Sequence, residues 1–306
     1  MQRRFKDYLI ISFKGLAMGA ADAVPGVSGG TIAFISGIYE ELITTISNVK
    51  PSLLKTLLSG NFKTFWQEAN GNFVVALLSG IVVSYVSFMK LAKYLLEHHP
   101  VLIWSFFFGL IVASIYFVGK QITKWNTSVF IALAIGAVAA FYISELPALG
   151  ENTSDGFLFI AGAIAICAMI LPGISGSFIL IILGAYKTLS HAISDFDIKK
   201  LALFFSGAII GLLSFSHLLK WLFKNYHNTT LAVLTGFIFG SLNKVWPWKE
   251  TLSWYTNSEG LQEPLTQKSV LPFAFQGDNQ IVWAIILMVL GFLTIFSLEK
   301  IGSKKQ

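Results

Sequence analysis

The sequence predicts an all-α, polytopic membrane protein with two inverted repeats, each a broken (re-entrant) helix pair plus three transmembrane helices. Three observations predict this fold class: the composition, a series of long uncharged stretches, and two copies of a Pro-Gly motif. The 306 residues are 55% hydrophobic and 12% charged, with a mean hydropathy of +0.69. Soluble domains carry about 25% charged residues, so this composition indicates a membrane protein.

The composition also excludes other classes of protein. The apolar content is too high for intrinsic disorder, and the single cysteine, Cys167, excludes a disulfide scaffold or a cysteine metal cluster. The net charge of +6 can indicate nucleic-acid binding. However, Arg3 and Arg4 are the only arginines, and the lysines are scattered between apolar runs. We therefore expect no nucleic-acid partner, no metal and no cofactor.

Five uncharged stretches are each long enough for a single crossing, which takes roughly 20 apolar residues. They are residues 73–89, 101–119, 127–144, 201–219 and 279–298. A sixth crossing is predicted at residues 225–243, which begin with polar residues and become apolar from Leu231.

Two further apolar stretches are interrupted near the middle by a Pro-Gly pair. Pro25-Gly26 interrupts residues 8–39, and Pro172-Gly173 interrupts residues 156–186. Proline removes a helical hydrogen bond and glycine frees the backbone, so we interpret each stretch as two half-length helices that dip into the membrane and turn back. Freed backbone groups at this depth must be covered by protein or a watery cavity, so we expect both breaks inside the helix bundle.

The placement of basic residues predicts the orientation, because lysine and arginine gather on the cytoplasmic side. With the amino terminus inside, the inner ends hold about twice as many basic residues as the outer connections. The inner set is Arg3, Arg4, Lys6, Lys50, Lys55, Lys63, Lys120, Lys124, Lys224, Lys300, Lys304 and Lys305. The outer set is Lys187, Lys199, Lys200, Lys244, Lys249 and Lys268. We predict that both termini are cytoplasmic.

The two interrupted stretches are copies of each other. The sequence PGVSGGTIAFISGIYEEL begins at Pro25, and PGISGSFILIILGAYKTL begins at Pro172, so the motifs match at an offset of 147 residues. A second block, which pairs Gly80 with Gly207, matches at an offset of 127 residues. The longer connection in the first copy accounts for the difference between the two offsets.

The repeat predicts the symmetry of the fold. We treat residues 1–306 as one integral membrane domain that contains a first repeat at 5–146 and a second at 155–300. Each copy crosses the membrane an odd number of times, so the second copy is inverted. Inverted repeats whose broken helices meet near the midplane are typical of secondary transporters.

Each Pro-Gly pair is followed by hydroxyl and small residues. These are Ser28, Gly29, Gly30 and Thr31 in the first copy, and Ser175, Gly176 and Ser177 in the second. Serine is a preferred N-cap, and the first amides of a helix lack internal partners and carry partial positive charge. Such a helix start suits phosphate or carboxylate. We predict an anion site at these residues together with Gly26, Gly173 and the nearby cation Lys14; the alternative is that the small residues only pack helices.

Asp22 lies three residues before Pro25 inside an apolar stretch. Acidic residues within spans are costly and usually functional, so Asp22 is a candidate proton carrier. The alternative is a hydrogen bond or ion pair that supports the break. Glu40 is a second candidate for proton coupling, although a solvated charge at the interface is the usual role of such a residue.

No pattern typical of an enzyme is present. The chain lacks HExxH, GxSxG and Walker motifs. His98-His99 lies in a predicted outer turn and His217 in a span, and neither has an acid at catalytic spacing. We therefore expect no catalytic residues.

The two motif regions resemble the signature regions of the bacterial polyprenyl-phosphate transporter (PopT) family. They read FKGLAMGAADAVPGVSGGTIAFISGIYEEL and MILPGISGSFILIILGAY. The resemblance extends from Arg4 to about Glu299 and implies a flippase that moves undecaprenyl phosphate across the cytoplasmic membrane. The lipid carrier is thereby returned for reuse in peptidoglycan and other envelope polymers.

The resemblance implies two partners, the lipid bilayer and a polyprenyl-phosphate lipid, and leaves a homo-oligomer open. The motif positions carried over from the family are Asp22, Pro25, Gly26, Ser28, Gly29, Gly30 and Thr31, then Pro172, Gly173, Ser175, Gly176 and Ser177. Two other functions remain as alternatives: a small-anion transporter or channel that uses the same sites, and a membrane-embedded lipid phosphatase. The second is weakened by the lack of arginine in the spans and of histidine near the motifs. The outer loop at 246–279 has no role that the sequence indicates.

Overall fold

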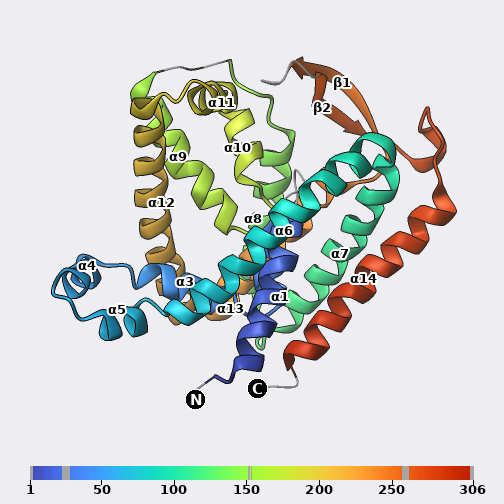
Figure 1. Ribbon diagram of the computed structural model, residues 1–306. Helices are drawn as coiled ribbons and strands as arrows, with labels where there is room; N and C mark the ends of the chain where they lie inside the picture. The colour runs from blue at the N-terminus through green and yellow to red at the C-terminus, as the bar shows by residue number, and fades with distance from the viewer. Residues whose placement is uncertain (1–2, 23–27, 151, 153, 257–261, 304–306) are drawn as a thin grey trace.

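The computed structural model describes residues 3–22, 28–150, 152, 154–256 and 262–303. Within these residues the chain forms fourteen α-helices, two short 3-10 helices and one two-stranded sheet (Figure 1). The first half contains α1 (Phe5–Asp22), α2 (Gly29–Ile35), α3 (Tyr39–Ser47), α4 (Pro51–Leu58), α5 (Phe62–Glu68), α6 (Gly71–His98), α7 (Pro100–Lys120) and α8 (Thr127–Glu145). The second contains α9 (Asp155–Ile170), α10 (Gly176–Ile182), α11 (Tyr186–Ser194), α12 (Ile198–Asn225), α13 (His227–Gly240), η1 (Ser241–Val245), β1 (Lys249–Thr256), β2 (Gln262–Ser269), η2 (Pro272–Ala274) and α14 (Ile281–Ser303).

Four helices, α6, α7, α8 and α12, are long and apolar enough to cross a bilayer. They contain the predicted crossings at 73–89, 101–119, 127–144 and 201–219, which are therefore confirmed as helices of spanning length. The predicted crossing at 279–298 falls in α14, which is apolar over Ile281–Ser297. The one at 225–243 becomes α13, which has only 14 residues and is shorter than the roughly 20 residues that a crossing takes.

The helices pack in pairs along close seams. α1 lies against α6 and α9 against α12, while α8 lies against α13 and α7 against α14. Glycine allows the backbones to approach closely in all four pairs. A Cβ atom at Gly80 would overlap the carbonyl oxygen of Ser12 on α1, and one at Gly207 would overlap that of Phe159 on α9. The two glycines paired by the offset of 127 residues thus make equivalent contacts.

The second apolar stretch breaks at Pro172-Gly173, as predicted, but turns back later than expected. α9 has 16 residues, so it is longer than the half-length helix that the sequence analysis predicted. It ends before Pro172 because the residue preceding a proline is disfavoured in the helical conformation. Gly173 then has a φ of 89°, and α10 follows with 7 residues. The sharp bend of 109° lies between α10 and α11, at Gly184, whose φ is 70°.

The first stretch has similar elements on either side of its break. Pro25 and Gly26 lie outside the described residues. α2 has 7 residues, like α10, and it ends before Gly37, whose φ of 72° matches that of Gly184. A glycine in this left-handed conformation is a common helix terminator.

The prediction of an all-α fold is wrong at residues 249–269. β1 and β2 pair as an antiparallel hairpin there, within the stretch that the sequence analysis left as a loop. The indole Nε1 of Trp248 donates to the carbonyl of Asn279 at 2.8 Å and that of Trp246 to the carbonyl of Val270 at 2.8 Å. Trp248 is 3% exposed and packs in a small core with Val101 and Ala284. The base of the hairpin is therefore fixed to α7 and α14.

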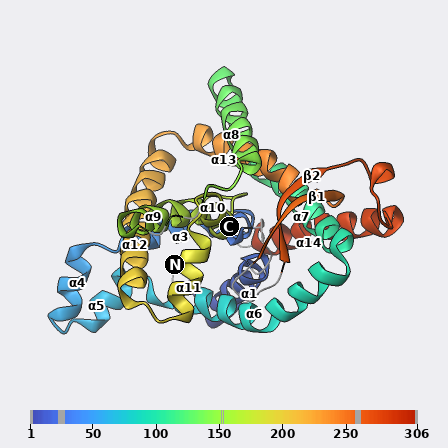
Figure 2. The same cartoon turned by 90° about the horizontal axis from the view of Figure 1, so that it is seen from above.

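The start of α1 and the end of α14 lie at one end of the bundle, and the hairpin and α11 lie at the other (Figure 1). Viewed from above, α10 lies near the middle, with α12 on one side and α7 and α14 on the other (Figure 2). The main core contains fully buried side chains from both halves of the chain, among them Phe73, Ile111, Leu231 and Ile295. The two halves therefore form one packed unit around the second Pro-Gly break.

Candidate functional site

The two Pro-Gly motifs touch each other inside the bundle, although 147 residues separate them in the sequence. The amide of Gly173 donates to the hydroxyl Oγ1 of Thr31 at 3.0 Å. The hydroxyl of Ser28 lies 3.4 Å from the carbonyl oxygens of both Met169 and Leu171, to which it donates. Ser28 is 2% exposed and Thr31 is 0% exposed. The carbonyls freed at the second break are thus partly satisfied by side chains of the first motif.

The amino end of α2 is already supplied with hydrogen-bond acceptors. Ser28 is the N-cap, and its Oγ accepts from the amide of Gly30 at 3.2 Å. The carboxylate of Asp22 accepts from the amide of Gly29 at 2.6 Å, and the amide of Thr31 donates to the carbonyl of Ser28 at 3.0 Å. Asp22 therefore occupies the position that an external anion takes at a helix start.

The amino end of α10 is more open. Ser175 is its N-cap, with Oγ accepting from the amide of Phe178 at 3.3 Å and lying 3.4 Å from the hydroxyl of Ser177. The position equivalent to Asp22 is Met169, so no carboxylate is supplied from α9. In the described part of the chain, no hydrogen bond uses the amides of Gly176 and Ser177.

A small, partly open cavity lies beside this second helix start. Gly173, Ile174, Ser175 and Phe178 line it from the break and from α10; Ala140, Ile143 and Ser144 line it from α8; and Ser241 and Lys244 line it from η1. The ammonium of Lys244 lies 4.0 Å from the centre of the Phe178 ring. The sequence analysis counted Lys244 only as an outer basic residue, because nothing in its position along the chain shows that η1 packs against α10.

Lys14, which the sequence analysis placed beside the anion site, lies at the other end of α2. Its Nζ donates to the carbonyl of Ser36, the C-cap residue, at 2.5 Å. A cation there is favoured because the carboxyl end of a helix carries partial negative charge. With 7 residues, α2 is about 10 Å long, which separates Lys14 from Ser28.

Glu40 lies near the surface rather than beside Asp22. Its carboxylate is 3.2 Å from Nε2 of His227, and both side chains are about half exposed, at 58% and 48%. The contact joins α3 to the start of α13, so it brings together the two halves of the chain at the rim of the bundle.

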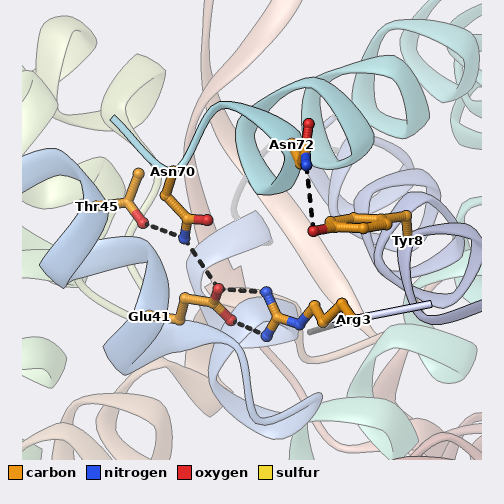
Figure 3. A network of polar contacts seen from close by, with 6 residues as sticks. All are labelled: Arg3, Tyr8, Glu41, Thr45, Asn70 and Asn72. Carbon is orange, nitrogen blue, oxygen red and sulfur yellow. Dashed lines mark hydrogen bonds and ion pairs between the residues drawn. The ribbon is translucent and has the colours of Figure 1, made fainter. Parts of the chain in front are cut away.

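The neighbouring acid, Glu41, holds the amino-terminal segment in place (Figure 3). Its carboxylate accepts two hydrogen bonds from the guanidinium of Arg3, at 2.5 and 2.6 Å. The side chain of Asn70 donates to Glu41 at 3.0 Å and to Thr45 at 3.1 Å. A bidentate pair of this kind fixes the relative orientation of the two side chains in addition to pairing their charges. The contacts therefore hold α1, α3 and the start of α6 together.

These features define a class of protein: a multi-pass helical membrane protein whose interior contains two broken segments in contact. The chain belongs to the undecaprenyl phosphate translocase-like family, which it matches over residues 18–263. It is similar to the polyprenyl-phosphate transporter of Vibrio cholerae serotype O1, with 46% identity over 99% of this chain and 100% of the relative.

A second relative is the polyprenyl-phosphate transporter of Staphylococcus aureus, with 31% identity over 76% of this chain and 84% of the relative. No solved structure matches the chain. The family predicted from the two motif regions is confirmed, and a transporter rather than an enzyme agrees with both relatives.

Proposed function

We propose that this chain is a flippase that moves undecaprenyl phosphate across the bacterial cytoplasmic membrane, so that the lipid carrier can be reused in envelope synthesis. The observation that carries the proposal is the direct contact of the two Pro-Gly motifs inside the bundle, in a chain of the undecaprenyl phosphate translocase-like family. Broken helices near the midplane are where transporters bind their substrates.

In this proposal the phosphate headgroup binds at the two helix starts while the polyprenyl tail stays in the lipid. The residues are Gly26, Ser28, Gly29, Gly30 and Thr31 in the first motif, and Gly173, Ser175, Gly176 and Ser177 in the second. The open amides of α10 and the adjacent cavity support binding at the second motif. Pro25 and Pro172 create the breaks, and Lys14 offsets charge from the far end of α2.

At the first motif a phosphate competes with Asp22, because both are anions and the amide of Gly29 has one hydrogen to donate. Protonation of the Asp22 carboxyl removes its charge and weakens its bond to Gly29. Proton uptake at Asp22 would thus open the first helix start to the headgroup, which couples transport to the proton gradient. Glu40, the second candidate for proton coupling, lies at the rim beside His227 and does not contact this helix start.

We further propose that the fold contains two inverted repeats that work by alternating access. Three pairs of equivalent helices have equal lengths: α2 and α10 have 7 residues, α3 and α11 have 9, and α6 and α12 have 28. The sequence predicts an odd number of crossings for each repeat, with α13 counted as one of them in the second, so in this proposal the second repeat is upside down relative to the first. The excess of basic residues at the end that holds both termini supports a cytoplasmic location for that end.

The function is tested by the accessibility of undecaprenyl phosphate at the outer surface of cells. Cells that lack the protein, with no other translocase present, are expected to expose more of the carrier, and cells that overproduce it less. Unchanged exposure in both would overturn the proposal. A small-anion transporter is the alternative, because the two helix starts would bind an anion whether or not it carries a polyprenyl tail. It would be favoured if the purified protein bound inorganic phosphate and ignored the lipid.

The helix starts are tested by Ser28→Ala combined with Ser175→Ala. Each substitution removes an N-cap, at a cost of about 1 kcal/mol, so the folded protein should persist while transport falls strongly. Ser87→Ala is the control, since its hydroxyl only bonds to carbonyls within α6. Full transport by the double variant would show that the two serines only pack.

A further inference from the structure

Two lysines lie together at the hairpin end of the bundle, and one of them lines the cavity. Lys244 of η1 lines the cavity next to Ser175, with its ammonium over the Phe178 ring. Lys249 of β1 donates to the backbone carbonyl of Lys244, and its ammonium lies 5.2 Å from the centre of the Trp104 ring. Aromatic faces attract cations, but they do not neutralise them.

One carboxylate, that of Glu145, acts on both lysines through space without forming an ion pair with either. Glu145, at the end of α8, accepts a hydrogen bond from the side chain of Asn243 at 2.5 Å. Asn243 in turn accepts from the hydroxyl of Ser269 at 2.7 Å. In the part of the chain that the structure describes, neither Lys244 nor Lys249 forms an ion pair.

The surroundings of the two lysines disfavour their charges. Burial lowers the pKa of Lys244, and burial together with the positive charge of Lys244 lowers the pKa of Lys249 to about 7. The charge of Glu145 opposes both shifts, but only in part. A partly buried pair of like charges is costly unless a counter-charge is supplied, so this place is suited to an anion.

The chemistry around the cavity fits a phosphate monoester. Such a group carries about −1.5 to −2 charges near neutral pH and has three acceptor oxygens. The hydroxyls of Ser144, Ser175 and Ser241 line the cavity. Those of Ser144 and Ser241 donate to the carbonyls of Phe141 and Ile238, so they must rotate away from these carbonyls to donate to a phosphate. Ala140 and Ile143 supply an apolar wall on the side of α8.

We propose that Lys244 and Lys249 form an anion site that receives the phosphate monoester of the lipid at the hairpin end, next to the second Pro-Gly motif. This inference rests on the proposed transport of a lipid phosphate. The hairpin lies at the end of the bundle opposite the termini (Figure 1), which is the predicted outer side. The site is therefore placed where a headgroup returning from the outer leaflet enters.

The test measures binding to the purified full-length protein in lipid nanodiscs. The ligands are undecaprenyl phosphate, the uncharged undecaprenol and inorganic phosphate. Lys244→Gln and Lys249→Gln should each raise the Kd for both phosphate ligands about tenfold, as expected for a lost hydrogen bond to a charged group, without changing the binding of undecaprenol. Lys268→Gln is the matched control, because Lys268 is an exposed lysine on β2 of the same hairpin.

Thermal unfolding separates a loss of binding from a loss of fold. If Lys244→Gln unfolds at a lower temperature than the wild type, Lys244→Arg, which keeps the positive charge, is measured as well. Phosphate binding restored in Lys244→Arg supports the site, and binding as weak as in Lys244→Gln overturns it. A folded Lys244→Gln, Lys249→Gln double variant with wild-type affinity for both phosphate ligands also overturns it.

The ligands also separate the failure of this site from the failure of the proposed function. If inorganic phosphate binds in a lysine-dependent way and the lipid does not bind, then the anion site holds and lipid transport is wrong. If the wild-type protein binds neither phosphate ligand, the anion site is wrong, and the leaflet assay decides on transport independently.

Discussion

At the scale of single residues, the position of a charged side chain in the fold decides whether it can contact an anion at a motif. Its distance along the chain from that motif does not. Lys14 is close to the first motif in sequence, but the seven-residue α2 places it at the opposite end of that helix from Ser28. Lys244 is remote from both motifs in sequence, yet it lines the cavity beside Ser175. The sequence predicts which residue types surround an anion, whereas tertiary packing selects which lysine reaches it.

Asp22 provides a prediction at this scale. Asp22→Asn keeps an oxygen that accepts from the amide of Gly29 but removes the negative charge, so the protein should fold and should bind the headgroup no less tightly. Transport by this variant should lose its dependence on the proton gradient, as measured by the leaflet assay with an uncoupler. Asp22→Ala leaves the amide without its acceptor and should cost about 1–3 kcal/mol of stability. A proton dependence that persists in Asp22→Asn would contradict the coupling role.

The titration of Lys249 gives a second prediction. With a pKa of about 7 in the empty site, the amine takes up a proton when a phosphate binds, because a nearby anion raises the pKa of a lysine. The contribution of Lys249 to affinity should then be complete below about pH 6 and fall as the pH rises from about 7 to 9. The measurement is the ratio of Kd values for Lys249→Gln and wild type across this range, which cancels the ionisation of the phosphate itself. A constant ratio would contradict the prediction.

At the scale of elements, the repeat in the sequence predicted the helices and the second break, but not the hairpin. The offsets of 147 and 127 residues identify equivalent segments, and three pairs of these form helices of equal length: α2 and α10, α3 and α11, and α6 and α12. The hairpin has no counterpart in the first copy, so the repeat contains no information about it. Its strands have 8 residues each. The indole of Trp246 bonds to the carbonyl of Val270, directly after β2, and the indole of Trp248 bonds to that of Asn279, just before α14.

The anchoring of the hairpin can be tested at Trp248. Trp248→Ala removes a side chain that is 3% exposed and should lower the stability by about 3–5 kcal/mol, the usual cost of a large buried aromatic group. Because Lys249 follows directly, phosphate binding should weaken as well. Trp254→Ala on β1 is the control, since Trp254 is 58% exposed. Thermal unfolding in detergent measures the difference, and equal effects of the two substitutions would contradict the anchoring role.

At the scale of the whole molecule, the small number of charged residues affects both the orientation of the chain in the membrane and the way in which an anion is bound. The charged residues make up 12% of the chain, and few lie at the contact between the two motifs, where Asp22 accepts from a backbone amide. An anion at this contact is therefore met mainly by amides and hydroxyls. The paired lysines stand at the hairpin end, so a headgroup would pass from cationic side chains to backbone donors as it moves inward.

The orientation of the molecule supplies the last prediction, since the path just described requires the hairpin to face outward. In a Cys167→Ser background, Lys268→Cys places a thiol on the hairpin and Lys63→Cys places one on α5, at the end of the bundle that holds the termini (Figure 1). Both positions are exposed. A membrane-impermeant maleimide should label Lys268→Cys in intact cells and Lys63→Cys only after the membrane is permeabilised, because the basic residues near α5 favour the cytoplasmic side. The reverse pattern would place the lysine site on the cytoplasmic side, and it could then only release the headgroup and not receive it.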